Sequence, residues 1–355
     1  MRKFFKIAGG IILALVVVAG LFVWWQRPNP ILTVTTWAGE YGRAQQSALF
    51  QPYGDKADVD VRPSLYAGGL DELRQAVTTK NYRGDVIDFE LPDAISACNE
   101  GLLEKIEPPQ DAKDFVPGAI GPCWIGSVIY SRVIGYDPDK VAPKKASDFF
   151  NLVNFPGNRG LRKNSGKYNL ELGLLADGAK PEEIYLLLET EEGISRALKN
   201  YQTIKQQIVW WTNSSEPLQM LADGRVVMTT MLNEDLFRAA THNQKVGAVW
   251  DGQLYEMEAF GIARGTPKLE MAKAFLTFAV SAEGMAGVAS WYPYGPARRS
   301  AWNRVPQNPE HKLDMTPFSP TAGGHFETAF AVNDAWWKEH GALAEARWQS
   351  FANQP

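Results

Sequence analysis

Apolar and polar positions follow two alternating periodicities along most of the chain. Short β-branched or continuous apolar runs predict strands at 32–36, 59–61 and 85–89. Between them, apolar residues recur every three or four positions, which predicts helices over 41–53, 69–78 and 92–99. Strands that alternate with helices favour an α/β doubly wound fold with a parallel sheet.

The alternation restarts after a long β-rich run at 127–136, which we expect to carry the chain between two lobes. A length of 355 residues also favours two domains or one bilobal unit. The expected helices are 146–152, 169–176, 181–188, 192–198, 215–223, 234–241 and 269–280, and the expected strands are 208–211, 226–231, 246–250 and 256–263.

The N-terminus carries the strongest local signal. Arg2, Lys3 and Lys6 precede an uncharged run, 7–25, that would span roughly 28 Å as a helix, close to the thickness of a bilayer core. The basic end should stay in the cytoplasm. This segment is either an uncleaved inner-membrane anchor or a cleaved signal peptide, and in both cases the rest of the chain is exported to the periplasm.

Composition and charge narrow the classes of protein. With 45% apolar and 21% charged residues, the chain is globular, and a net charge of −4 argues against nucleic-acid binding. Cys98 and Cys123 are an even pair in an exported chain, so we expect a disulfide, with two buried free thiols as the alternative.

Tests for enzyme motifs are negative. The segment "GLRKNSGKY", 160–168, has one residue too many between its glycines for a phosphate loop and lacks Ser or Thr after the lysine. The sequence has no GxSxG or GxGxxG, its four histidines are scattered, and no spacing suits a metal. We therefore expect no cofactor and no catalytic set.

Candidate binding residues cluster at expected strand ends, where open α/β sheets bind ligands. Trp37, Glu40 and Tyr41 follow the first strand, and Glu90 ends the third. An ordinary strand-to-helix turn would use the same residues. Glu256 and Glu258, two apart on a strand, face one side and form either an acidic wall for an ammonium group or a solvated face.

Four segments, "TWAGEYG", "GDVIDFELPDAISACNEGLLEKI", "WWTNSSEPLQMLADGRVVM" and "YGPARRSA", resemble the periplasmic solute-binding proteins of bacterial ABC transporters, of the spermidine/putrescine-binding type. The resemblance runs from about Leu32 to the C-terminus. It implies two doubly wound α/β lobes joined by crossing strands, which close on a ligand. The expected division is an anchor or signal with linker at 1–30, lobe 1 at 31–137 plus 259–303, and lobe 2 at 138–258 plus 304–355.

The resemblance also assigns roles to residues. Trp37 matches an aromatic that lines the cleft, Glu40 and Tyr41 match an acid–aromatic pair, and Glu258 matches an acid that meets a ligand amine. Tyr292 or Tyr294 matches a late aromatic before a proline. From the "WWTNSSEP" segment we add Trp211 and Glu216 as candidate cleft residues.

Three positions depart from the polyamine pattern. Glu256 stands where an aromatic is usual, Leu232 replaces a tryptophan, and Tyr168 falls near where an acid would hold the second amine. Lys163 is available to meet a carboxylate, which would suit a zwitterionic amino acid derivative.

The sequence therefore predicts a monomeric, non-catalytic binding protein that delivers a small amine-bearing solute to an ABC permease. A membrane-tethered sensor, or an exported enzyme on the same scaffold, are the alternatives.

Overall fold

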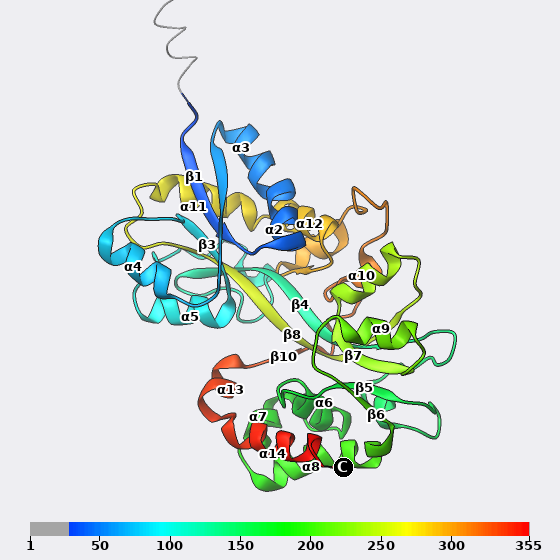
Figure 1. The fold of residues 1–355 in the computed structure, drawn as a ribbon. Helices are drawn as coiled ribbons and strands as arrows, with labels where there is room; N and C mark the ends of the chain where they lie inside the picture. Colours follow the sequence, from blue (N-terminus) through cyan, green and yellow to red (C-terminus); the bar gives the residue numbers. More distant parts are fainter. Residues whose placement is uncertain (1–27, 355) are drawn as a thin grey trace, which may run out of the picture.

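The computed structural model describes residues 28–354 (Figure 1). The expected N-terminal helix at 7–25 lies outside these residues. Among the residues described, no helix is long and apolar enough to cross a membrane.

Two halves, which we call lobe 1 and lobe 2, share one mixed sheet whose strand order is β2-β1-β3-β8-β4-β7-β5-β6. Figure 1 shows β4 and β8 running diagonally from one half to the other. Strands β1, β2 and β3 pair in parallel in lobe 1, and β5 pairs in parallel with β6 and β7 in lobe 2. The crossing strands pair antiparallel with β3, with each other and with β7. The expected two-lobed fold is confirmed, although the sheet is mixed rather than all parallel.

The elements of the first half of the chain keep close to the expected ranges. The helix expected at 41–53 is longer and includes a π-helical turn at Gln46–Phe50. The elements are β1 (Ile31–Thr36), α2 (Gly39–Gln45), α3 (Gln51–Ala57), β2 (Asp60–Leu65), α4 (Asp71–Thr79), β3 (Val86–Glu90), α5 (Leu91–Asn99) and β4 (Trp124–Tyr136).

The second half of the chain forms lobe 2 and then returns to lobe 1 before its last segments. The elements are β5 (Arg159–Arg162), α6 (Asn169–Ala176), α7 (Ile184–Leu188), α8 (Glu191–Thr203), β6 (Ile208–Trp211), α9 (Glu216–Ala222), β7 (Met228–Leu232), α10 (Glu234–Thr241), β8 (Gly247–Ile262), α11 (Leu269–Ala279), α12 (Ala282–Trp291), β9 (Gly295–Pro296), β10 (Phe330–Ala331), α13 (Asp334–His340) and α14 (Ala342–Ala352).

Three expectations about these elements were wrong. The helix expected at 146–152 is a 3-10 helix, Ala146–Phe150. The short strand β5 was not expected, because only one of its four residues is strongly apolar. The strands expected at 246–250 and 256–263 are one strand, β8. Gly252, at φ +68°, lies between the two expected strands, in a bulge where the pairing jumps from Arg132–Leu254 to Ile134–Val249.

Each lobe has its own core. Leu32, Phe260 and Phe275 are buried in lobe 1, while Phe149 and Trp348 are buried in lobe 2. Burying side chains of this size contributes roughly 1.5–3 kcal/mol each. The boundaries expected near 137/138 and 258/259 fall just after β4 and inside β8, so the two strands that join the lobes also carry residues of both.

The cysteines form the expected bond. Cys98, at the end of α5, is linked to Cys123, which lies just before β4. The bond fastens α5 to the start of a crossing strand.

Candidate functional site

Trp37, just after the end of β1, lies beside the carboxyl group of Glu258. Gly39, at φ +80°, makes the turn between β1 and α2 in a conformation that glycine adopts without strain. The turn leaves the indole Nε1 of Trp37 donating to Oε2 of Glu258 on β8, at 3.1 Å. The Trp37 ring also meets the Tyr66 ring edge-on, with 4.8 Å between centroids. Trp37 is thereby fixed in orientation beside a carboxylate.

A buried carboxyl, Asp88 on β3, lies behind this pair. Its Oδ2 accepts from the Tyr41 hydroxyl at 2.8 Å and from Nε2 of Gln45 at 2.7 Å, and its Oδ1 accepts from Ser127 at 3.1 Å. Burial nevertheless raises the pKa of Asp88 to about 6. Burial, followed by the charges of Asp88 and Glu90, also raises the pKa of Glu258 well above its ordinary value. Such a cluster of carboxyls favours a cationic group beside it.

Aromatic rings extend the same wall. Tyr130 on β4 stacks on Tyr294, with centroids 5.3 Å apart, and Tyr294 lies 5.1 Å from Tyr41. Glu234, at the start of α10 in lobe 2, accepts from the Tyr292 hydroxyl at 2.6 Å and from the Tyr294 hydroxyl at 3.3 Å. These bonds connect the two lobes beside the aromatic wall.

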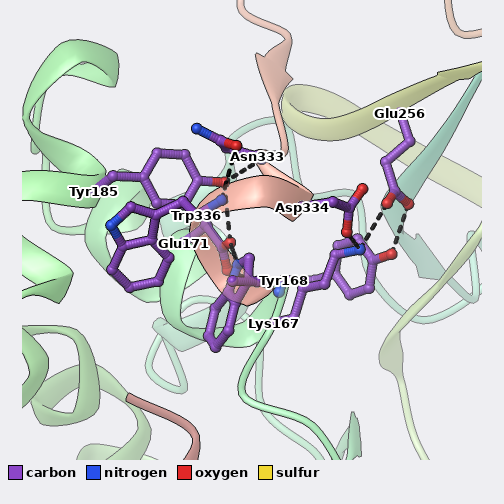
Figure 2. Close-up of polar contacts among 9 residues, drawn as sticks. Lys167, Tyr168, Glu171, Tyr185, Glu256, Asn333, Asp334 and Trp336 are labelled. Atoms are coloured by element: carbon purple, nitrogen blue, oxygen red, sulfur yellow. Dashed lines mark hydrogen bonds and ion pairs between the residues drawn. The ribbon is translucent and has the colours of Figure 1, made fainter. Parts of the chain in front are cut away.

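A second polar group surrounds Glu256, two residues before Glu258 on β8. Its Oε1 pairs with the Lys167 ammonium at 2.7 Å, and its Oε2 accepts from the Tyr168 hydroxyl at 2.6 Å. Lys167 also pairs with Asp334 at the start of α13 (Figure 2). Burial acts to raise the pKa of Glu256, but Lys167 and the hydrogen bonds lower it below its ordinary value. Glu256 is therefore a charged carboxylate that already has a cation.

Two arginines, Arg132 and Arg162, lie on the lobe 2 side of the Glu256 group. The Arg132 guanidinium on β4 lies over the Tyr168 ring, 4.1 Å from its centroid, and its buried Nε has no hydrogen-bond partner among residues 28–354. Burial and the charge of Arg132 lower the pKa of Arg162, at the end of β5. Both arginines line a cavity of about 20 Å³, together with Trp211 and Thr230, whose buried Nε1 and Oγ1 also lack partners among those residues. Unpaired buried donors of this kind suit an anionic group.

The larger opening beside these groups is acidic. A cleft of about 800 Å³ lies between α5 of lobe 1 and the α13 region, and Glu90, Tyr130, Glu256 and Asp334 line it. Its further charged residues are Asp93, Glu182, Glu339 and Lys338. The excess of carboxylates attracts cations into the cleft.

The structure brings together most of the residues proposed from the sequence. Trp37, Tyr41, Glu258 and Tyr294 form one cluster, and Glu90 pairs in register with Glu258. Glu256 lies in the adjacent Lys167 group, and Trp211 lines the arginine cavity.

Two proposed residues lie apart. Glu40 pairs with Arg43 at the exposed start of α2 and lines a separate hollow of about 480 Å³. Glu216 accepts from the backbone N–H groups of Thr212 and Asn213, at 3.0 and 2.7 Å, and so closes the turn that leads into α9. These backbone hydrogen bonds lower the pKa of Glu216. Both roles are those of helix-terminal acids.

Sequence reasoning missed Asp88 as a buried carboxyl, and Lys167 and Arg132 altogether. Arg132 had one signal: it is a charged residue inside an otherwise apolar run at 127–136. Lys163, considered as the carboxylate partner, instead lies close enough to Lys205 to lower that lysine's pKa, after burial. Its side chain lines neither the acidic cleft nor the arginine cavity.

The fold and the interlobe groups define a two-lobed binding protein, and comparisons with known proteins agree. Residues 48–312 match the family described as "Bacterial extracellular solute-binding protein". The chain is 34% identical over 331 residues to the gamma-aminobutyric acid-binding protein of Pseudomonas aeruginosa, covering 92% of each chain. The chain therefore belongs to the bacterial extracellular solute-binding proteins of ABC transport.

Solved structures show the same fold. A substrate-binding protein of an ABC transporter from Bradyrhizobium japonicum is 27% identical, with a TM-score of 0.72 over 91% of this chain and 99% of that one. A receptor for gamma-aminobutyric acid (GABA) is 24% identical, with a TM-score of 0.71 over 91% and 98%. The family match and the Pseudomonas aeruginosa relative are both solute-binding proteins, so the chain is a solute-binding protein and not an enzyme. The curated relative is named for GABA, whereas the sequence segments suggested polyamines.

Proposed function

We propose that the protein binds a short ω-amino acid of the GABA class in its interlobe cleft and delivers it to an ABC permease. The supporting observation is that one face of the crossing strands presents both kinds of charge. Glu258 and its register partner Glu90 lie at one end, and Arg132 lies at the other.

The spacing of these groups suits a short zwitterion. Arg132 pairs in register with Leu254, four residues from Glu258 on β8. At about 3.3 Å per residue, the two backbone positions are about 13 Å apart. Both side chains are long and lie on the same face of the crossing strands, so a ligand of a few carbon atoms would bridge the distance that remains between them. Trp37 and Tyr130 provide aromatic faces for the ammonium and the methylenes. The name and identity of the Pseudomonas aeruginosa relative support the same ligand class.

Calorimetry on the purified protein tests this proposal with GABA, putrescine and butyrate, which share a four-carbon chain but differ in terminal charges. GABA should bind most tightly, since only GABA satisfies both ends. Arg132→Gln should weaken GABA binding at least tenfold, because it removes the charged donor for the carboxylate. Equal or tighter binding of putrescine by the unmodified protein would overturn the proposal.

A further inference from the structure

One cation of this chain occupies a position that a second ligand ammonium would need. The Lys167 ammonium lies between Glu256 and Asp334, at 2.7 Å from the Glu256 carboxylate, and the three side chains are 20%, 11% and 27% exposed. Figure 2 shows the Lys167 ammonium between the carboxylates of Glu256 and Asp334, with the Tyr168 hydroxyl donating to Glu256 as well.

The backbone holds Lys167 in place from both sides. The N–H of Gly166 donates to Glu345 at 2.7 Å, and the N–H of Tyr168 donates to the buried Glu171, also at 2.7 Å. Tyr168 itself has φ +74°, a conformation that costs energy for a residue with a side chain and persists only where its surroundings enforce it. The backbone on both sides of Lys167 is therefore fixed, and the ammonium itself is held by Glu256 and Asp334.

Without Lys167, Glu256 and Glu258 would be two carboxyls on one strand face with no cation from residues 28–354 beside either. Glu256 and Glu258 share one face of β8 and are two residues apart, so their backbone positions are about 7 Å from each other. A short diamine separates its two ammonium groups by a similar length. Lys167 neutralises Glu256, which leaves Glu258 and Glu90 to take a single ammonium.

We propose that Lys167 is a specificity-determining residue, a built-in ammonium that fills the second amine position and restricts the cleft to ligands with one ammonium group. This proposal rests on the proposed function, because it assumes that the ligand amine lies beside Glu258. It assigns a reason for the sequence departures at Glu256 and Tyr168: both residues hold the lysine rather than the ligand.

The test compares GABA with putrescine by calorimetry on Lys167→Met, which keeps most of the stem but removes the charge. Putrescine affinity should rise at least tenfold, and the gain should disappear in the double variant K167M/E256Q. Lys167→Arg keeps a cation and should not gain putrescine binding. Lys199→Met, on the exposed face of α8, controls for a unit change in net charge. Putrescine affinity in K167M within threefold of the unmodified protein would overturn the proposal.

A chemical-rescue measurement covers the case in which K167M does not fold. Lys167→Ala is heated in the presence of propylammonium chloride or sodium chloride at equal ionic strength. A higher thermal midpoint with propylammonium alone supports an ammonium position at Lys167, and equal midpoints in both salts overturn it.

If the unmodified protein fails to bind GABA, the proposed function is wrong. If it binds GABA but K167M gains no putrescine binding, only the role of Lys167 falls.

Discussion

The Trp37 indole donates a hydrogen bond to Glu258 across 221 positions of sequence, at 3.1 Å. The bond joins the end of the first strand of lobe 1 to a strand that crosses between the lobes. It holds an aromatic face next to a carboxyl whose ordinary charge is disfavoured by burial.

Two substitutions of Trp37 separate the ring from its hydrogen bond. Trp37→Phe keeps an aromatic face against Tyr66 but loses the donor to Glu258, and we expect GABA binding to weaken about threefold. Trp37→Ala also loses the ring, which is worth about 0.5–2 kcal/mol to a cation, so the combined loss should be roughly 7- to 90-fold. Calorimetry measures both, with thermal midpoints as the control for folding. An unchanged affinity in W37A would place the ligand elsewhere.

Asp88 predicts a specific dependence of stability on pH. Burial raises its pKa to about 6, from 3.8. Between these values the folded protein retains a proton that the unfolded chain has released. The contribution of Asp88 to the free energy of unfolding is therefore largest below about pH 4 and is lost as the pH rises through about 6.

Urea unfolding at several pH values measures this contribution, and Asp88→Asn is the control because it cannot titrate. The difference in unfolding free energy between the two proteins should change with pH from about 4 to 6 and stay flat above about 7. A difference that is constant over the whole range would show that Asp88 is not the titrating group.

The disulfide predicts a loss of stability on reduction. Cys98 and Cys123 are 25 residues apart, and closing a loop of this length restricts the unfolded chain. Replacing both by serine should lower the free energy of unfolding by about 3 kcal/mol. Denaturant unfolding checks this value, and the unmodified protein with a reductant should match the double variant. Equal stability with and without the bond would contradict it.

The fold could be predicted from the sequence where local pattern and burial agree. The helices at 169–176 and 234–241 and the strand at 208–211 have the expected bounds. The helix at 234–241 buries Leu236 and Ala239 on one face, whereas the helix at 169–176 is buried along most of its length and the strand is a continuous apolar run. The break expected inside β8 failed, because Gly252 marks a bulge as readily as a turn, and only pairing with β4 distinguishes them.

The candidate site was partly predictable for a similar reason. Trp37 follows β1 and Glu90 ends β3, as the expected strand ends suggested, and Glu258, expected on a strand face, pairs in register with Glu90. The partners of Glu256 were not predictable, since Lys167 comes from a loop 89 positions before it and Asp334 from the start of α13, 78 positions after it. Glu40 and Glu216 have the residue type of ligand groups, but the structure uses both at helix starts, which local sequence does not distinguish from a binding role.

The crossing strands β4 and β8 carry Tyr130, Arg132, Glu256 and Glu258 on one face, which we call the floor of the proposed site. We expect these four residues to keep their spacing if the outer parts of the lobes rotate on binding, because β4 and β8 are paired with each other and shared by both lobes. On this view, the floor discriminates between solutes by their length and charge when they first bind, before the lobes close. Closure then sets how long a solute stays, so variants of the floor should act on selectivity and variants of the outer lobes on residence time.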